Sequence, residues 1–288
     1  MSLAKDLRGA PLAEGLRARI AADAAAVTAR GVTPTLAVVV ASADPAVKKY
    51  AEAKGRTAAK VGVTVRLETV DPAAGQAAAL ARVADLSADP AVHGIILELP
   101  VDDALDAAGL IAAIVPHKDV DGLTAANLGL IAAGREADAI APATPLACIA
   151  LAEAWGPLRG ERVCVVGRGR SVGRALIPML INRDATVTVC HTKTPDLRAA
   201  IEPCDVVFVA AGRAGLITQA HLRHGQVVVD AGINVTDTGV VGDVAPDCAE
   251  IAAAMTPVPG GVGPLTSTLI FANLMQALRL QGHLAGGG

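Results

Sequence analysis

The chain has 288 residues, of which 52% are hydrophobic, and it carries a formal net charge of −3. A chain of this length can bury two ordinary domain cores, while its slightly acidic charge and few aromatic residues argue against nucleic acid as a partner. No apolar stretch approaches the roughly 18 residues that a membrane span requires, and the amino terminus lacks the layout of a secretory signal. We therefore expect a cytoplasmic protein that acts on a small molecule and binds no membrane.

The five cysteines are odd in number, widely spaced and without a CxxC pair that would indicate a metal or redox site. Most of them lie in apolar stretches typical of strands or helices. We expect buried, unreactive thiols and predict no metal site.

The first half of the chain alternates predicted helices with short apolar strands. Helix-spaced apolar residues run from Leu12 to Val27, and a second helix is expected to begin at Pro45. The remaining predicted elements are strands at Thr35–Ala41, Thr64–Val70 and Gly94–Pro100 and helices at Gln76–Leu86 and Leu105–Val115. Such alternation implies parallel strands joined by right-handed crossovers, so the predicted fold class is α/β.

The stretch Ala141–Pro145 is predicted to separate two domains, with Thr144 capping the next helix and Pro145 in its first turn. Beyond it, strands and helices alternate again, as in a nucleotide-binding sheet. The predicted strands are Glu161–Gly167, Ala185–Cys190, Val206–Gly212 and Gln226–Asn234. The glycine tail, Gly286–Gly288, is expected to be disordered.

The segment Lys48–Lys54, KKYAEAK, places Tyr50, the single tyrosine, four residues before a lysine. On a helix this spacing puts the ring and the ammonium of Lys54 on one face, one turn apart. An aromatic ring beside a titratable amine can hold a flat substrate and move its protons. The alternative interpretation is a solvated lysine face with an incidental tyrosine.

Ligands of open parallel sheets bind at the carboxyl ends of the strands. In the first half these ends are Ser42–Pro45 and Glu98–Val101. The loop Pro116–Gly122, PHKDVDG, adds charged side chains and a glycine. This loop either belongs to the same site or forms a solvated turn.

A glycine-rich turn lies between the strand Glu161–Gly167 and the next predicted helix. Gly167, Gly169 and Gly173 form G-x-G-x-x-x-G, a context in which the helix N-terminus can receive a pyrophosphate. The same glycines would also suit a tight structural turn.

The end of the following strand bears on the choice between NAD and NADP. An acid there would bind the ribose 2′-hydroxyl of NAD, whereas a 2′-phosphate calls for cations and hydroxyls. The residues are CHTKT, Cys190–Thr194, which include no acid. Thr192 and Lys193, together with Arg168, offer positive charge and hydrogen-bond donors to a phosphate and therefore favour NADP. Each of these three residues is also typical of an exposed surface.

The loop Thr256–Thr266, TPVPGGVGPLT, packs three prolines and three glycines into eleven residues. Its rigid, exposed backbone is suited to lining a ligand cleft, and an interdomain crossing is the alternative.

The motifs of the chain, taken in order, resemble those of the bifunctional methylenetetrahydrofolate dehydrogenase and methenyltetrahydrofolate cyclohydrolase (FolD) family. They are YxxxK, GIILELP, KDVDG, PATP, VVGRGRSVG, CHTKT, VDAGIN, GDV and TPVPGGVGPLT. The resemblance implies a folate-binding catalytic lobe, residues 1–141 completed by a carboxyl-terminal helix at 265–288, and an NADP-binding Rossmann domain at 142–264. Folate would lie in the cleft between them. The resemblance further implies a homodimer through the dinucleotide domain and a role in one-carbon metabolism and purine biosynthesis.

The resemblance also implies residue roles. On the folate side, Tyr50 would stack on the pterin, Asp121 would hold its polar edge and Lys54 would serve proton transfer, with Leu99, Pro259 and Gly260 close to the substrate. On the cofactor side, Gly167, Gly169 and Gly173 would form the phosphate turn, Arg168 and Thr192 would lie near the 2′-phosphate, and Ile233 and Thr266 would line the nicotinamide. These roles suit the chemistry, because hydride transfer needs alignment and hydrolysis needs an activated water.

Four positions depart from the family pattern. Glu98 stands where the family has glutamine, Val47 and Gly169 where serine is usual, and Ala143 where cysteine is usual. A carboxylate near Lys54 would favour the charged ammonium, opposite to what a general base requires, unless the pair shares a proton. We hypothesise that the dehydrogenase activity is retained and that the cyclohydrolase is weakened or altered in its pH dependence. Val47 is expected to alter the water network of the cleft.

Other functions stay open on the sequence alone. A shikimate-type NADP dehydrogenase would also join an α/β substrate lobe to a Rossmann lobe, but it does not explain PVPGGVGP. A paralogue that only dehydrogenates, or that binds folate or nucleotide without turnover, would be consistent with the altered cleft.

Overall fold

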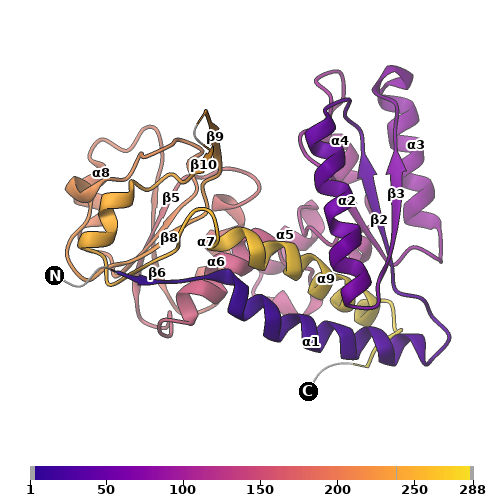
Figure 1. The fold of residues 1–288 in the computed structure, drawn as a ribbon, viewed down its shortest axis with the longest axis horizontal. Helices are drawn as coiled ribbons and strands as arrows, with labels where there is room; N and C mark the ends of the chain where they lie inside the picture. The colour runs from indigo at the N-terminus through magenta and orange to yellow at the C-terminus, as the bar shows by residue number, and fades with distance from the viewer. Residues whose placement is uncertain (1–3, 238, 286–288) are drawn as a thin grey trace. The chain divides into compact units, whose positions relative to one another are not determined.

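A computed structural model describes residues 4–237 and 239–285, apart from the side chains of Ala46, Tyr50 and Ala53. The chain forms two compact units, drawn in Figure 1. The three-stranded unit comprises Glu14–Ala143 and the segment from Ser267 onward. The six-stranded unit comprises the segment up to Ala13 and Thr144–Thr266. The predicted α/β class is confirmed, and the predicted glycine tail lies outside the described residues.

The three-stranded unit is built on a parallel sheet with strand order β3-β2-β4. Its strands are β2 (Thr35–Val40), β3 (Thr64–Thr69) and β4 (Gly94–Leu97). The central strand β2 is buried along its whole length, because both faces of the sheet are covered. Its helices are α2 (Pro45–Lys60), α3 (Gly75–Ala88), α4 (Ala107–Ala112) and α5 (Ala125–Ala132), joined by most of α1 (Gly9–Thr28) and α9 (Val262–Leu280).

Alternate residues of β2 belong to two apolar cores. Leu36, Val38 and Val40 pack with α1, α2 and α9, where Phe271 is fully buried. Ala37 and Val39 pack with α3 and α4 on the other face. Figure 1 shows α2 and α3 on opposite sides of these strands.

The six-stranded unit contains a wholly parallel sheet with strand order β1-β11-β8-β7-β5-β6. Its strands are β1 (Lys5–Asp6), β5 (Arg162–Val166), β6 (Thr186–Cys190), β7 (Val206–Val209), β8 (Val227–Asp230) and β11 (Ala254–Met255). Its other elements are α6 (Ala143–Glu153), α7 (Gly173–Ile181), α8 (Leu197–Ile201) and the antiparallel hairpin β9 (Asn234–Thr236) with β10 (Gly239–Val241). Short 3₁₀ turns along the chain are Pro72–Ala74, Pro116–Lys118, Glu136–Asp138, Gln219–His221 and Pro246–Glu250.

Two features of this sheet differ from the sequence expectation. The segment up to Ala13 groups with the six-stranded unit, since Lys5 pairs with Ala254, although it was expected in the other lobe. Strand β7 ends at Val209, and β8 ends at Asp230, each three or four residues before its expected end. The strands stop because the following N–H groups turn away from the sheet and bind buried carboxylates.

All five cysteines are free and buried, as predicted. Burial raises the pKa of Cys148 and of Cys248 to about 12, which keeps both thiols protonated and unreactive. Within the described part of the chain, no helix is long and apolar enough to cross a membrane.

Candidate functional site

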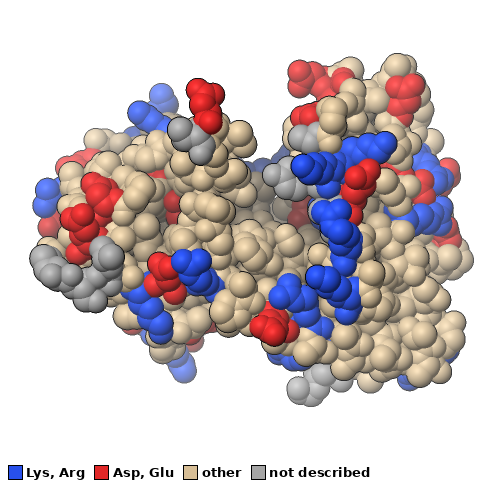
Figure 2. Space-filling model, in the orientation of Figure 1, with Lys and Arg blue, Asp and Glu red and all other residues tan. Residues whose placement is uncertain are grey.

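Helix α2 begins just beyond the carboxyl end of β2 and carries both predicted residues of the KKYAEAK segment. Tyr50 belongs to this helix, but its side chain lies outside the described part of the structure. Lys48 and Lys49 are exposed, and Figure 2 shows a short row of basic side chains on this unit, interspersed with acidic ones. The Lys54 side chain is only 18% exposed. A solvated face therefore describes Lys48 and Lys49 but not Lys54.

Lys54 forms an ion pair with Glu98. The Lys54 Nζ atom lies 2.5 Å from Glu98 Oε1, and the Glu98 side chain is 9% exposed. Glu98 follows β4 directly and is held there by its own N–H, which donates to the carbonyl of Val39 at 2.9 Å. Among the described residues, no hydrogen bond accompanies the ion pair at Oε1. The carboxylate is thus a buried partner of Lys54 at the carboxyl end of the sheet.

The KDVDG loop is a buried, internally bonded segment rather than a solvated turn. Lys118 Nζ donates to the carbonyls of Ser87 and Asp89, each at 2.8 Å. Asp119 is 1% exposed and accepts the N–H groups of Gly122, at 2.9 Å, and Thr124, at 2.7 Å. The side chains of Lys118 and Asp119 therefore stabilise the loop through these hydrogen bonds.

Among the hydrogen bonds of the described side chains, none that holds the loop uses the third charged group, Asp121. The loop runs beside β4, since the Val120 N–H donates to the carbonyl of Ile95 at 3.3 Å. Burial, together with the charges of Asp119 and Glu98, raises the pKa of Asp121 to about 7, while the Lys54 ammonium acts in the opposite direction. Lys54, Glu98 and Asp121 thus form one electrostatically linked group.

The other residues expected near the substrate fall into different environments. Leu99 is 45% exposed beside this group, and its peptide bond to Pro100 is cis. Val47 is buried in the apolar core that α2 shares with β2, and the expected effect of this position on the water network stays a prediction. Ala143 is also buried. Pro259 and Gly260 belong to the six-stranded unit.

The glycine-rich turn lies at the carboxyl end of β5, and the first turn of α7 follows it. Gly167 has φ 113°, and a side chain there would overlap the carbonyl of Ala210. A side chain at Gly173 would overlap the backbone of Gly167. Gly169, in contrast, faces open space, so nothing in this structure excludes a serine there. Gly167 and Gly173 thus form a backbone cradle that a pyrophosphate can approach closely.

The turn after β6 lies beside this cradle, because the Gly167 N–H donates to the carbonyl of Cys190 at 2.9 Å. Two hydrogen bonds close the turn: the His191 N–H donates to Thr194 Oγ1 at 2.9 Å, and the Lys193 N–H donates to His191 Nδ1 at 3.1 Å. Arg168, Thr192 and Lys193 are exposed at this edge. The donors and the absence of an acid at this turn fit a 2′-phosphate, so the residues present suit NADP.

The remaining predicted cofactor residues lie farther along the same unit. Ile233 follows β8 and is 67% exposed. Thr266 lies in the first turn of α9, where its hydroxyl donates to the carbonyl of Val262 at 3.1 Å. The Thr256–Thr266 loop borders a hollow of about 520 Å³ at the carboxyl ends of β8 and β11, which Asp230 and Gly242 also line.

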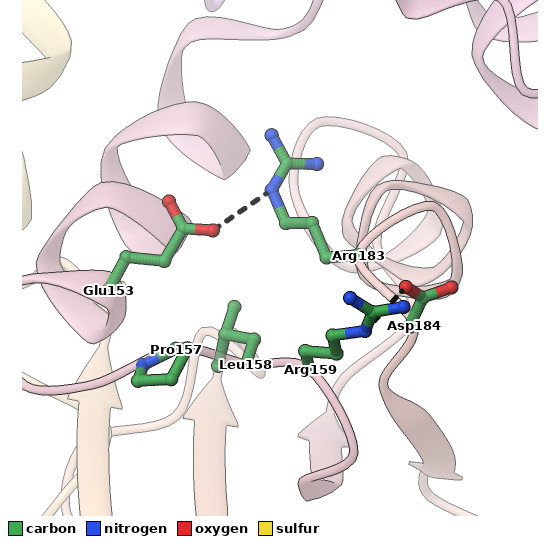
Figure 3. Close-up of a pocket in the computed structure, with 6 residues that line it drawn as sticks. All are labelled: Glu153, Pro157, Leu158, Arg159, Arg183 and Asp184. Carbon is green, nitrogen blue, oxygen red and sulfur yellow. Dashed lines mark ion pairs between the residues drawn. The ribbon is translucent and has the colours of Figure 1, made fainter.

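A second hollow, of about 490 Å³, lies at the opposite end of the six-stranded sheet (Figure 3). Its arginines already have carboxylate partners: Arg159 lies 3.3 Å from Asp184, and Arg183 lies 3.4 Å from Glu153. It adjoins the amino ends of β5 and β6, whereas ligands of such sheets bind at the carboxyl ends. We therefore do not assign it to the candidate site.

Two site-forming residues were missed in the sequence, namely Asp119 and Asp243. Both are buried, and each carboxylate accepts several N–H groups of the loops that carry predicted site residues. Both lie in short motifs of the sequence, KDVDG and GDV, but only the fold shows which N–H groups they bind.

Both parts of the chain match one protein family. Residues 7–121 match the catalytic domain of the tetrahydrofolate dehydrogenase/cyclohydrolase family, and residues 142–282 match its NAD(P)-binding domain. The chain is 43% identical to the bifunctional protein FolD of Heliobacterium modesticaldum, over 98% of this chain and 99% of that protein. It is 46% identical to FolD of Deinococcus radiodurans, over 96% and 93% of the two chains.

Solved structures agree with these matches. The bifunctional enzyme FolD of Campylobacter jejuni superposes with a TM-score of 0.92 at 32% identity, over 96% of this chain and 98% of that one. FolD of Trypanosoma brucei, solved with NADP cofactor and an inhibitor, superposes with a TM-score of 0.90 at 30% identity, over 98% and 99% of the two chains.

Proposed function

Because the chain belongs to the tetrahydrofolate dehydrogenase/cyclohydrolase family, we infer that it is a bifunctional, NADP-dependent enzyme. It oxidises 5,10-methylenetetrahydrofolate to 5,10-methenyltetrahydrofolate and hydrolyses the latter to 10-formyltetrahydrofolate. The observation that carries this proposal is the linked group of Lys54, Glu98 and Asp121 in the catalytic-domain match.

In the oxidation, the protein's task is alignment of donor and acceptor carbons. NADP, when bound, accepts the hydride. The cradle of Gly167 and Gly173 would hold the pyrophosphate, Arg168 and Thr192 the 2′-phosphate, and Ile233 and Thr266 the nicotinamide side. Tyr50 would stack on the pterin, with Leu99, Pro259 and Gly260 at its edges. Asp121, with a pKa of about 7, can present either a carboxyl or a carboxylate to the polar edge of the ring.

In the hydrolysis, water adds to the methenyl carbon and loses a proton. The carbon–nitrogen bond to N5 then breaks: the hydroxyl of the adduct loses its proton to become the formyl carbonyl, and N5 takes up a proton. A group beside the water must take the first proton. Lys54 is the amine at the site, and its 2.5 Å contact with Glu98 makes the pair the unit that holds or releases that proton.

The activity is tested by supplying purified protein with methylenetetrahydrofolate and NADP. We expect NADPH formation, followed by loss of the methenyl absorbance as water adds. No NADPH at saturating substrate would exclude the dehydrogenase and leave a non-catalytic paralogue or, if shikimate is turned over instead, a dehydrogenase of that type. NADPH formation without loss of the methenyl absorbance would leave a dehydrogenase-only enzyme.

Glu98 is expected to weaken the hydrolysis or to change its pH dependence. A buried carboxylate at 2.5 Å stabilises the charged ammonium of Lys54, and only an uncharged amine can take a proton from water. Glu98→Gln should therefore raise the cyclohydrolase rate near pH 7 by about tenfold and change the pH dependence of that rate. The dehydrogenase rate should change less than threefold, because hydride transfer uses no base.

The measurement is methenyltetrahydrofolate hydrolysis from pH 6 to pH 9 for the wild type and Glu98→Gln. Glu68→Gln is a matched control, since Glu68 also forms a part-buried salt bridge, to Arg66 at 2.6 Å, but does so on β3. Superimposable pH profiles for wild type and Glu98→Gln would refute the proposed effect.

We also infer that the protein forms a homodimer through the six-stranded unit and works in the cytoplasm, where its product supplies one-carbon units, including those for purine biosynthesis. The hairpin β9–β10 supports the dimer, because it exposes Val235 by 84% and Val240 by 39%, and these residues pair across the strands.

A further inference from the structure

Two buried aspartates in the six-stranded unit have no part in the proposed chemistry. Asp243 is fully buried, and Asp230, at the end of β8, is 2% exposed. Burying a charged carboxylate is costly unless donors surround it. Their hydrogen bonds therefore indicate what each carboxylate is for.

Asp243 binds the loop that follows β7. Its Oδ2 accepts the N–H groups of Ala211, at 2.7 Å, and Gly212, at 2.8 Å. Its Oδ1 accepts the Arg213 N–H at 2.8 Å and the side-chain amide of Asn234 at 2.9 Å. Three consecutive N–H groups directed at one carboxylate hold the loop in a single conformation.

Asp230 holds Asp243 in turn. Its Oδ1 accepts the N–H groups of Gly232, at 2.8 Å, and Asp243, at 3.1 Å, while Oδ2 accepts the Val244 N–H at 2.9 Å. A side chain at Gly232 would overlap the Asp243 carboxylate, and one at Gly242 would overlap the Asp230 carboxylate. Each aspartate thus packs against a glycine of the other's segment, so the two segments interlock.

The loop that Asp243 holds supports the glycine-rich turn. The Ala210 N–H donates to the carbonyl of Val166 at 2.8 Å. Gly167 lies so close to Ala210 that a side chain on the glycine would overlap the Ala210 carbonyl. A displacement of residues 210–213 would therefore also displace Gly167. Asn234, the residue that follows Ile233, donates to the Asp243 carboxylate that holds this loop.

We propose that Asp243 is a positioning residue for the dinucleotide: by binding the N–H groups of residues 211–213, it holds the surface on which the phosphate-binding turn rests. This inference rests on the proposed binding of NADP. Asp243 acts through the backbone and does not itself touch the cofactor.

The test is Asp243→Asn, which replaces one accepting oxygen by a donor. We expect the Kd of NADP, measured by calorimetric titration, and the KM for NADP to rise about tenfold, as for loss of a charge-assisted hydrogen bond. The kcat at saturating NADP should stay within about twofold, because the variant still reaches the same bound state. Asp205→Asn is the matched control: Asp205 likewise accepts a backbone N–H, of Arg162 at 3.1 Å, but before β7 at the other end of the sheet. It should leave both constants unchanged.

If Asp243→Asn does not fold, Asn234→Ala removes one donor to the same oxygen and should raise the Kd about threefold. An unchanged Kd in a folded Asp243 or Asn234 variant, or an equal rise in Asp205→Asn, would overturn the inference. NADP binding needs no folate, so a wild type that binds NADP without oxidising methylenetetrahydrofolate would defeat the proposed activity while the ratio of Kd values still decides the role of Asp243.

Discussion

At the scale of single residues, the candidate site places several charged side chains in a buried region, where removing a charge from water is unfavourable. Asp119 uses its carboxylate to hold N–H groups, and Glu98 pairs with Lys54, which leaves Asp121 with unfavourable neighbours of its own sign. Burial in the first place, and then the charges of Asp119 and Glu98, raise the pKa of Asp121 to about 7. A residue kept against such a cost has a reason beyond stability, which is consistent with a role in binding the substrate.

The raised pKa of Asp121 predicts a pH-dependent stability. The folded state holds the Asp121 proton up to about pH 7, whereas the unfolded chain releases it near 3.8, so the free energy of unfolding of the wild type falls as pH rises between these values and then levels off. Asp121→Asn removes this loss. Relative to the wild type, the variant should therefore gain on the order of 2 kcal/mol in free energy of unfolding between pH 5 and pH 8, because only about two units of the shift from 3.8 to about 7 lie above pH 5.

Urea unfolding of both proteins at pH 5, 6, 7 and 8 measures this difference. Asp103→Asn, at an exposed position in the loop after β4, is the control and should follow the wild type at every pH. A constant offset between Asp121→Asn and the wild type would show that Asp121 ionises normally.

At the scale of elements, the loops rather than the helices carry the special geometry. Gly122 closes the KDVDG loop with φ 70°, and a side chain there would collide with the backbone at Ile140 and Pro142. Asn273 of α9 joins the loop to the same backbone segment, donating to the carbonyls of Val120, at 2.8 Å, and Ala141, at 2.9 Å. The loop that presents Asp121 is thus held by close packing against residues 140–142 and by the Asn273 side chain.

Gly122→Ala should lower the free energy of unfolding by about 3 kcal/mol, because it adds the cost of a left-handed alanine to a backbone overlap. Gly15→Ala is the matched control: Gly15 lies within α1 with nothing within 4 Å of an added methyl group, so alanine should stabilise the protein by about 0.5–1 kcal/mol. Urea midpoints of the two variants measure the contrast. An equal effect of both substitutions would contradict the packing described for the loop.

At the scale of the whole molecule, each unit needs segments from both ends of the chain. Strand β1 completes the six-stranded sheet through its pairing with β11, and α9 supplies Phe271 and Leu274 to the core of the three-stranded unit. Neither unit is therefore a continuous piece of sequence.

The proposed homodimer is tested at this scale. Val235→Glu places a charge on the exposed apolar pair of the hairpin and should shift the protein toward monomer in light scattering coupled to size exclusion, because burying an unpaired carboxylate opposes association. Ile181→Glu, at an apolar side chain 56% exposed on α7, is the control and should not change the mass. A monomeric wild type, or an unchanged mass for Val235→Glu, would contradict this interface.

Local patterns in the sequence were sufficient for the α/β class, the long helices and strands and the cradle of Gly167 and Gly173, because apolar periodicity and glycine placement act over a few residues. The tertiary structure alone decided the pairing of β1 with β11, the ends of β7 and β8, and the contact of Lys54 with Glu98, 44 positions away. It also assigned Asp119 and Asp243 to backbone N–H groups that no spacing rule identifies. These features depend on which loops meet at the carboxyl edge of a sheet, and that is set by the packing of the whole chain.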